Sequence, residues 1–394
     1  MSEVSTRASA FWVEGFASTL NLFKLQRKNS KRSLSNKRFD KLFTHELISR
    51  KALGLLGYII GRAIRSFLLV LGVAALTFLL THVVAPNPAY IWAGPHASKS
   101  VVQAVIVEYR LNQPYYVQLY YYIISTLSFN FGVSPYFKQP VSSLIAVYFP
   151  RTLELVVFAM MLTAFLGVYS GAFAAAHKDR AGDYTVRFFY LVSWSMPPFL
   201  VALLLQLFLA YELKLLPPTQ LANPALSPPR EITGFLLIDS LLEHDYAFFY
   251  SALRHLVLPT LSLALISFGI ITRITRSSML QSMSAEFYRT AIMKGVGRRR
   301  AIYVHALKNS LIPVITLLAL TFSFMIAGSV VIEEVFSYQG MGYLVTQALY
   351  NYDYPTLVGS TVVIAISVIL ANFVADVAYA LIDPRIRLGG EEAS

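Results

Sequence analysis

The sequence predicts an all-α, polytopic membrane protein with six transmembrane helices. Three observations lead to this fold class. Of the 394 residues, 56% are hydrophobic and only 14% are charged, whereas soluble domains carry roughly 25% charged residues. Six apolar runs are each long enough to cross about 30 Å of hydrocarbon as a helix of about 20 residues. The basic residues outside these runs are concentrated on one side of the expected membrane, which is typical of membrane proteins.

The six runs follow a polar N-terminal segment. They cover residues 66–85, 153–176, 188–210, 256–274, 313–332 and 356–382. Inside a bilayer a spanning segment must be helical, because no water is present to pair with free backbone groups. The third run contains Pro197 and Pro198. Because proline lacks a backbone donor, we expect a kink there. Glu154 lies at the start of the second run, where a helix N-terminus favours a carboxylate.

The distribution of basic residues sets the orientation and limits the partners. Of the 33 Lys and Arg residues, 26 lie in four segments that a six-span chain places on one side of the membrane. These segments are residues 1–65, 177–187, 273–310 and those after 382. The other seven lie in the remaining connections. This asymmetry predicts that both termini are cytoplasmic. It also accounts for the formal charge of +12 without a nucleic-acid partner. The chain has no cysteine, which excludes disulfides and thiolate metal sites.

We expect three parts in the chain. Residues 1–57 form a basic cytoplasmic extension that is partly disordered, residues 58–388 form the six-helix domain, and residues 389–394 form a short cytoplasmic tail. The stretch 24–41 is rich in Lys, Arg, Ser and Asn. This composition favours a disordered tail attracted to anionic lipid, with a specific docking arm as the alternative.

The connection between the fourth and fifth runs carries the most informative pattern. Residues 286–313 read EFYRTAIMKGVGRRRAIYVHALKNSLIP. The pattern predicts a short helix over 285–294, ended by Gly295 in the left-handed conformation. A second helix is expected from about Arg298 toward the fifth run. This gives a helix–turn–helix on the cytoplasmic side. The alternative is a basic loop that only holds anionic lipid through Arg298, Arg299 and Arg300.

Polar residues near the runs are few. Asp376 lies in the sixth run, and Asn372 precedes it by one helical turn on the same face. We interpret Asn372 and Asp376 as a structural polar pair that supports helix packing. An acid within a span is also a candidate functional group, so the alternative is a role of Asp376 in binding a proton or the substrate. His82 and His255 flank runs on the outer side. We interpret them as structural residues rather than metal ligands.

Residues 286–313 resemble the EAA loop of ABC-importer permeases, in the form found in dipeptide, oligopeptide and nickel permeases. Arg289-Thr290-Ala291 takes the place of the Glu-Ala-Ala triplet, and Gly295 and the HALKNSLIP stretch follow it. Three further segments are similar to this family in the same order. They are PRTLEL at 150–155, IEEVFSYQGMG at 332–342, with Tyr338-Gln339 in place of the more usual Trp-Pro, and ANFVADVAYALIDPRIR at 371–387. The resemblance spans about residues 58–388.

The resemblance implies an ABC type I importer permease fold and a translocation pathway for peptides, with oligosaccharides or nickel as alternatives. It implies an external substrate-binding protein, a second homologous permease in the lipid membrane, and two ATPase subunits that carry the ATP. No cofactor is expected in this chain, which lacks the G-x-x-x-x-G-K-[ST] phosphate loop and is not expected to be an enzyme. The resemblance assigns ATPase coupling to Glu286, Arg289, Thr290, Ala291, Gly295, Arg298, Arg299 and His305. An ion-driven transporter is the alternative, and it would need several midplane acids or paired broken helices.

Overall fold

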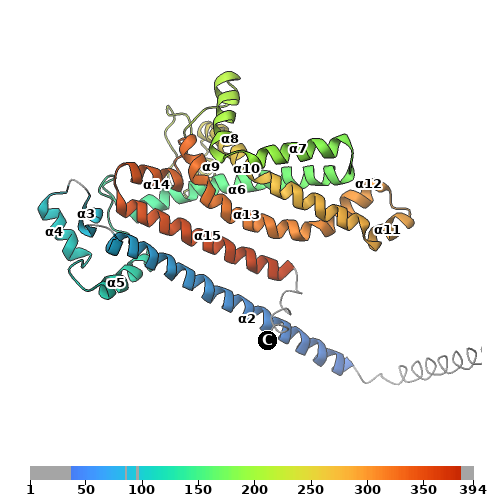
Figure 1. The fold of residues 1–394 in the computed structure, drawn as a ribbon, viewed down its shortest axis with the longest axis horizontal. Helices are drawn as coiled ribbons and strands as arrows, with labels where there is room; N and C mark the ends of the chain where they lie inside the picture. The colour runs from blue at the N-terminus through green and yellow to red at the C-terminus, as the bar shows by residue number, and fades with distance from the viewer. Residues whose placement is uncertain (1–36, 85–86, 95–96, 383–394) are drawn as a thin grey trace, which may run out of the picture. The chain divides into compact units, whose positions relative to one another are not determined.

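The computed structural model describes residues 37–84, 87–94 and 97–382, and this part of the chain is helical, without a named strand. The α-helices and the π-helical segments (η) follow one another along the chain (Figure 1). In order they are α2 (Lys37–Phe78), η1 (Leu79–Val84), α3 (Pro88–Ala93), α4 (Lys99–Glu108), α5 (Tyr115–Leu127), α6 (Val141–Ala176), α7 (Ala181–Ser195), α8 (Pro198–Leu205), η2 (Gln206–Glu212), α9 (Leu236–Leu242), α10 (Tyr246–Ser284), α11 (Glu286–Met293), α12 (Arg298–Arg300), η3 (Ala301–Ala306), α13 (Leu307–Val335), α14 (Met341–Tyr350) and α15 (Tyr354–Ile382).

The chain divides into two compact units, residues 1–61 and 62–394. In the first unit, residues 37–61 form the first part of α2, so the expected boundary after residue 57 falls inside a continuous helix. Most of the expected N-terminal extension and the whole tail 389–394 lie outside the described residues. The contacts and sites below belong to the second unit.

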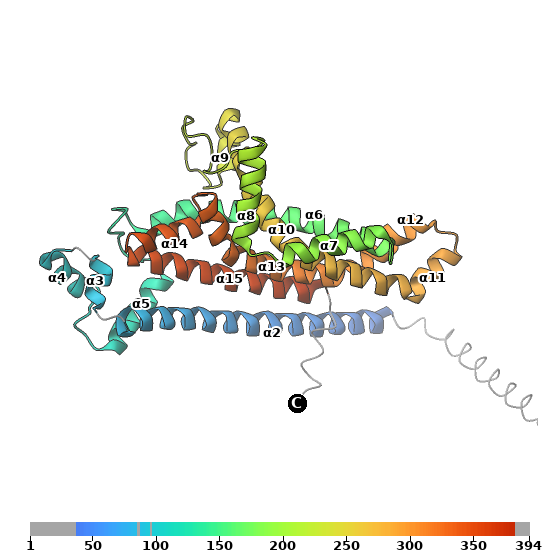
Figure 2. The same cartoon turned by 45° about the horizontal axis from the view of Figure 1, so that its top comes forward.

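Within the described residues, five helical segments are long and apolar enough to cross a membrane. They are Gly57–Val84, Val141–Ala176, Tyr246–Ser284, Arg298–Val335 and Tyr354–Val377. A sixth crossing results if α7 and α8–η2 count as one span, although the two parts are bent by 110° (Figure 2). The expected all-α architecture is confirmed, and six spans are reached when the bent pair is counted as one.

The bend lies at the two prolines, where we expected only a kink. Helix α7 ends at Ser195, Pro197 caps α8, and Pro198 is the first residue of α8. A proline is well tolerated there, because the first amides of a helix have no partner within the helix. The carbonyl of Pro197 accepts hydrogen bonds from the amides of Leu200 and Val201, at 3.0 and 3.3 Å. The prolines therefore start a new helix in a new direction.

The expected start of the second span is wrong. Helix α6 begins at Val141 and continues through Pro150, so Glu154 lies inside the helix and not in its first turn. Glu154 is buried, and its Oε1 atom accepts a hydrogen bond from the amide of Leu237, at 3.0 Å. The carboxylate therefore lies at a helix N-terminus as expected, but at that of α9 (Leu236–Leu242).

Helices α6 and α10 cross at very short range. A Cβ atom on Gly167 would lie 2.5 Å from the Ile271 side chain, and one on Gly171 would lie 2.7 Å from the Thr272 carbonyl oxygen. Between the two glycines, the Oγ atom of Ser170 and Oγ1 of Thr272 are 2.8 Å apart. Small residues at this spacing let two membrane helices approach closely. The crossing therefore joins the two helices into a tightly packed pair.

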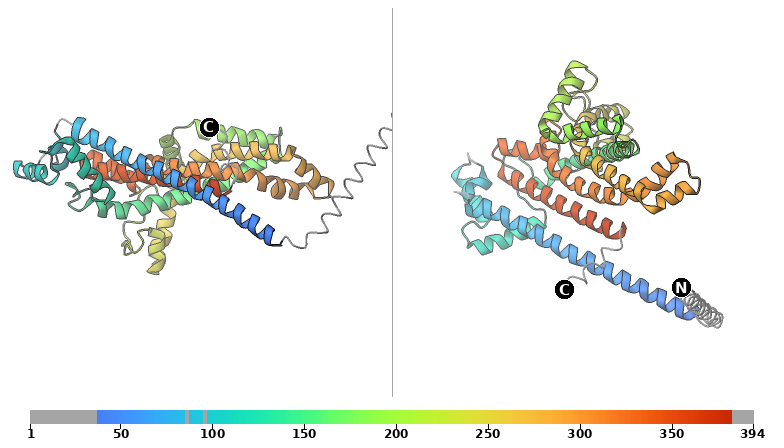
Figure 3. Two further views of the ribbon diagram at one scale, coloured as in Figure 1. Left: turned by 90° about the horizontal axis from the view of Figure 1, so that it is seen from below. Right: turned by 45° about the vertical axis from the view of Figure 1, so that its right-hand side comes forward.

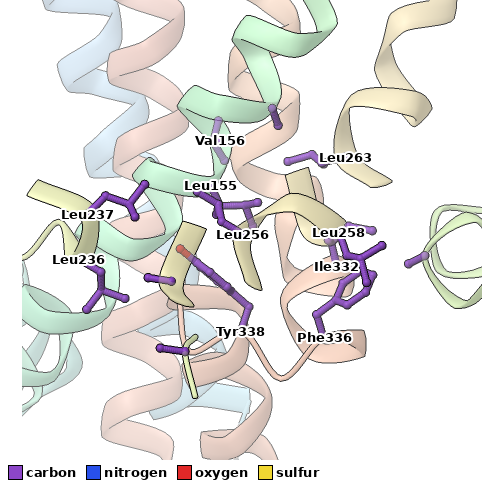
Figure 4. Packing of buried hydrophobic residues seen from close by; sticks show 14 of the residues in the cluster. Leu155, Val156, Leu236, Leu237, Leu256, Leu258, Leu263, Ile332, Phe336 and Tyr338 are labelled. Carbon is purple, nitrogen blue, oxygen red and sulfur yellow. The ribbon is translucent and has the colours of Figure 1, made fainter. Parts of the chain in front are cut away.

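A second contact region lies farther toward the other end of the same helices. Its buried apolar side chains come from α6, α9, α10, α13 and the segment after α13 (Figure 4). Leu155, Leu258 and Ile332 are fully buried in this cluster, and Phe336 and Tyr338 are nearly so. The spans α6, α10 and α13 therefore share one core. Helix α9 and the segment after α13 pack into the same core.

Candidate coupling site

The predicted helix–turn–helix is present and lies between α10 and α13. Helix α11 (Glu286–Met293) follows the N-cap residue Ala285, and the Thr290 hydroxyl donates to the Glu286 carbonyl at 2.9 Å. The α11–α12 segment projects beyond the neighbouring helices in two further views (Figure 3). It lies at the opposite end of the helices from α3, α4 and α5 (Figures 1 and 2). We call residues 286–306 the coupling segment.

The turn after α11 has the geometry predicted for Gly295. Gly295 has φ +80°, in the left-handed region. Its amide donates to the Ile292 carbonyl at 2.9 Å, and the amide of Val296 donates to the Ala291 carbonyl at 3.1 Å. These two bonds form a Schellman motif, which satisfies carbonyls at the helix end. Gly297, two residues later, has φ −57° and caps α12.

The outer surface of α11 is uncovered in the single chain. None of its residues is buried. Three of its apolar side chains are exposed: Phe287 by 41%, Ile292 by 40% and Met293 by 79%. The sequence assignment missed all three, because it followed the Arg-Thr-Ala triplet. The sequence signal that could have identified them is the position of these apolar residues on a short amphipathic helix outside the spans, where neither lipid nor the expected core would cover them.

The inner surface of the coupling segment is packed against three spans. Tyr288 of α11 contacts a buried cluster that contains Met279 of α10 and Ile302 of η3. Ala172 and Ala175 of α6 complete the same cluster, together with Ala306. Met279 and Ala306 have no exposed surface. Helix α11 is therefore in close packing contact with α6, α10 and the start of the span that contains η3 and α13.

The predicted basic residues lie on the exposed side of the segment. Arg298 and Arg299 of α12 are exposed, as are Glu286, Arg289 and Thr290. Ala291 is half-buried, and His305 is exposed with its carbonyl accepting from Asn309 Nδ2, at 3.2 Å. Within the described residues, none of the three arginines of α12 forms an ion pair. The structure therefore places the eight predicted residues on one projecting segment.

An ion pair that the sequence analysis missed supports the same end of the helices. The Arg276 guanidinium of α10 binds the Asp183 carboxylate of α7 through Nε and Nη2, at 2.7 and 2.6 Å. Asp183 is fully buried, and it also accepts from the amide of Asp179 at 3.0 Å. The two-point contact fixes the start of α7 against α10.

At the opposite end, a buried carboxylate fixes the start of α14. Glu333 of α13 is fully buried and accepts hydrogen bonds from the amides of Gly342 and Tyr343, at 2.7 and 3.2 Å. It also accepts from the Thr152 hydroxyl at 2.8 Å, and Thr152 Oγ1 accepts from the Met341 amide at 2.7 Å. A carboxylate is favourable at the first amides of a helix. Glu333 therefore caps α14, as Glu154 does for α9.

The segment between α13 and α14 keeps its position despite the Tyr338-Gln339 pair. Tyr338 is 2% exposed, and its hydroxyl donates to the Arg151 carbonyl at 3.2 Å. Burial raises the pKa of Tyr338 well above its ordinary value, so the hydroxyl remains a donor. The tyrosine therefore links this segment to α6.

Asp376 has a different partner from the one expected. Arg62 of α2 forms an ion pair with it through the guanidinium, whereas no hydrogen bond joins Asn372 to Asp376 in the described part of the chain. Asn372 lines the same cavity of about 310 Å³ as Arg62 and Asp376. The sequence separation between Arg62 and Asp376 hides this contact from pattern analysis.

The two histidines have local partners. The Nδ1 atom of His82 lies 2.8 Å from Thr81 Oγ1, and that of His255 lies 2.8 Å from the Ser251 carbonyl oxygen. Across the residues the structure describes, no three His, Asp or Glu side chains come together as a metal site.

Comparison with known proteins identifies the family. The family model described as "Binding-protein-dependent transport system inner membrane component" matches residues 166–388, which include the whole coupling segment. The chain belongs to this family. As an inner membrane component of a binding-protein-dependent transport system, it is a multi-pass permease and not itself an enzyme. The family name also implies a binding protein and an ATPase as partners.

Individual relatives match over most of their length. The chain is 36% identical over 325 residues to a probable D,D-dipeptide transport system permease protein of Escherichia coli K12, covering 82% of this chain and 96% of the relative. It is 34% identical to a dipeptide transport system permease protein of Alkalihalophilus pseudofirmus, covering 84% of this chain and 100% of the relative. It is 33% identical to a probable peptide ABC transporter permease protein of Sinorhizobium fredii, covering 84% of this chain and 99% of the relative. The predicted family is confirmed.

Proposed function

We propose that the chain forms half of a peptide translocation pathway and that its coupling segment docks on an ATP-hydrolysing subunit. The observation that carries this proposal is the contrast between the two surfaces of α11. Its outer surface leaves Phe287, Ile292 and Met293 exposed, and its inner surface is packed into the core of the spans. An uncovered apolar surface on a projecting segment is typical of a protein interface.

The assembly follows from the family. A second homologous permease completes the pathway, two ATPase subunits bind ATP beneath it, and an external binding protein delivers the substrate. Peptides are the proposed substrate, because the permeases to which the chain is similar are named for dipeptide or peptide transport. Oligosaccharides and nickel were left open by the sequence, and none of the three relatives described above is named for their transport.

Docking gives a mechanism for coupling. When the ATPase subunits close on ATP, the coupling segment moves with them. Because Tyr288 and Met279 lie in one buried cluster with α6 and η3, the spans follow this movement. The pathway then changes its access from one side to the other. Such a change requires ATPase contacts that differ between the two states. Exposed Arg298 and Arg299 add charge at the rim, which guides association more than it strengthens it.

The proposed orientation has the coupling segment, residues 1–57 and the tail 389–394 in the cytoplasm, as the distribution of basic residues indicates. The part before α2 is proposed to be dispensable for transport. A chain that begins at residue 37 keeps all of α2, and we expect it to retain at least half of the peptide uptake at equal membrane level. Loss of uptake by this truncated chain would instead assign a docking role to residues 1–36.

The docking proposal is tested with two variants of the same chemistry. Met293→Glu places a carboxylate on the exposed surface of α11, and Val107→Glu does the same on α4, where Val107 is 68% exposed. We expect Met293→Glu to reduce ATPase co-purification and ATP-driven dipeptide uptake by tenfold or more, because a buried unpaired charge at an interface is costly. Val107→Glu should leave co-purification unchanged. Equal ATPase retention by both variants would reject docking at α11.

A further inference from the structure

A cavity of about 330 Å³ lies at the opposite end of the helices from the coupling segment. It is enclosed by the outer end of α2–η1, by the helices α3 to α5 and by the start of α15. Figures 1 and 2 show α3, α4 and α5 grouped at this end. Pockets for small ligands have volumes of about 300–1,000 Å³. The volume of this cavity lies at the lower end of that range.

The wall of the cavity is a set of interlocking rings. Trp92 stacks on Tyr109 with their centroids 4.7 Å apart. His82 contacts both Trp92 and Tyr122, at 5.6 and 5.5 Å between centroids. The Tyr122 hydroxyl donates to Thr77 Oγ1 at 2.9 Å, which fixes this ring to α2. Each ring is held by its neighbours, so the wall is preformed.

Gly132 allows the chain to approach this wall. It has φ +80°, and a Cβ atom there would lie 2.0 Å from the Tyr109 hydroxyl oxygen. Burial, with a contribution from the nearby Glu108 carboxylate, raises the pKa of Tyr109 to about 12. The phenol is therefore neutral and able to donate at ordinary pH.

Three polar groups of the lining have no matching partner. Trp92 is 6% exposed, and its Nε1–H has no hydrogen-bond acceptor in the described structure. A buried donor without an acceptor is rare in proteins. Glu108 and Arg110 both line the cavity, and neither forms an ion pair with any described residue. The Arg110 guanidinium lies 3.7 Å above the centre of the Tyr121 ring, which holds it in place.

We propose that this cavity binds a short zwitterionic peptide, of dipeptide size, at the outer end of the permease. The Arg110 guanidinium pairs with the peptide carboxylate, the Glu108 carboxylate pairs with its ammonium group, and Trp92 Nε1–H donates to its carbonyl oxygen. An apolar side chain of the peptide packs against Tyr109 and Tyr122. The choice of a peptide rests on the proposed function. A phosphoethanolamine lipid headgroup carries the same two charges but has no apolar group to place among the rings.

The three tryptophans of the chain make the test direct. With Trp12→Phe and Trp194→Phe, Trp92 becomes the only indole in the full-length protein. This variant is placed in nanodiscs of phosphatidylcholine and phosphatidylglycerol and titrated with the dipeptide Ala-Phe, while Trp92 emission is recorded. We expect a saturable change. The N-acetylated, C-amidated dipeptide should bind at least tenfold more weakly, because it lacks both charges.

Two substitutions and one control assign the charges. Glu108→Gln and Arg110→Gln should each raise the dissociation constant about tenfold, as expected for the loss of one charge-assisted contact. Lys138→Gln removes an exposed cation from the same external connection and should leave binding unchanged.

Three results would overturn the proposal. They are no saturable change with Ala-Phe, equal binding of the blocked dipeptide, or an emission change that requires only phosphatidylethanolamine in the nanodisc. The titration uses neither ATP nor the other subunits, so it is separate from the permease assignment. Peptide uptake by the complete assembly without any Trp92 response would reject the pocket alone.

Discussion

The left-handed turn at Gly295 gives the sharpest prediction about coupling. In the structure, Gly295 has φ +80° and no atom lies within 4 Å of the position its Cβ would take. A side chain there meets no clash, so its whole cost comes from the backbone. For an ordinary L-residue the left-handed conformation costs about 1–2 kcal/mol, and a β-branched residue is among the least suited to it.

The cost of Gly295→Val falls on one turn. If the turn leaves the left-handed conformation, the bonds from Gly295 and Val296 to the last carbonyls of α11 are lost, and each contributes about 1 kcal/mol. A penalty of about 1–2 kcal/mol lowers the population of the native turn by about 5- to 30-fold relative to alternatives. We expect Gly295→Val to reach the membrane at normal levels and to lose dipeptide uptake.

Two variants separate backbone strain from other effects. Gly297→Val adds the same side chain two residues away, where φ is −57° and the space is also open. It should retain uptake. Gly295→Asn should retain more uptake than Gly295→Val, since Asn tolerates the left-handed region better. ATPase co-purification and ATP-driven uptake measure the result. If the two valine variants transport equally, the reasoning about the turn is refuted.

Three further predictions concern the structure that supports coupling. Gly171→Leu should lower the melting temperature and the membrane level, because overpacking a helix crossing costs about 1–3 kcal/mol. Gly328→Leu places the same side chain in open space and should lower neither. Equal melting temperatures for the two variants would contradict the close crossing of α6 and α10. Glu333→Ala should lower the free energy of unfolding by about 1–3 kcal/mol, because the amides at the start of α14 lose their hydrogen-bond acceptor. A denaturation curve with an unchanged midpoint would disprove this prediction. Arg62→Asp and Asp376→Arg should each reduce uptake and together restore it, and additive losses in the double variant would argue against the ion pair.

Local sequence patterns predicted those features that depend on neighbouring residues. The helix α11 and its end at Gly295 follow from composition and glycine placement within a few residues. The spans could be predicted from the length of each apolar run, because every segment that crosses the bilayer must pair its own backbone groups in a helix. The family that the resemblance suggested is confirmed by a match over 166–388, whereas the coupling role of Arg289-Thr290-Ala291 stays a prediction.

Features that depend on distant contacts were not predicted. Arg62 finds Asp376, and Glu333 caps a helix that begins after it in the chain, because packing of whole helices brings these groups together. The two prolines signalled a bend, but its size of 110° depends on what each half packs against. The exposure of Met293 was also missed, because the sequence signals an amphipathic helix outside the spans but does not show which of its apolar residues lack a neighbour.

The central claim is that α11 is the contact surface for the ATPase on the cytoplasmic side, and one measurement tests it directly. The chain contains no cysteine, so Met293→Cys introduces a single thiol at an exposed position of α11. The assembled transporter is treated with a short thiol-to-amine cross-linker in inverted membrane vesicles and in intact cells. The account predicts a cross-link to the ATPase subunit in the assembled transporter. It also predicts labelling by an impermeant reagent in inverted vesicles that lack the ATPase subunit, but not in intact cells. Labelling from outside intact cells, or an assembled complex without this cross-link, would contradict it.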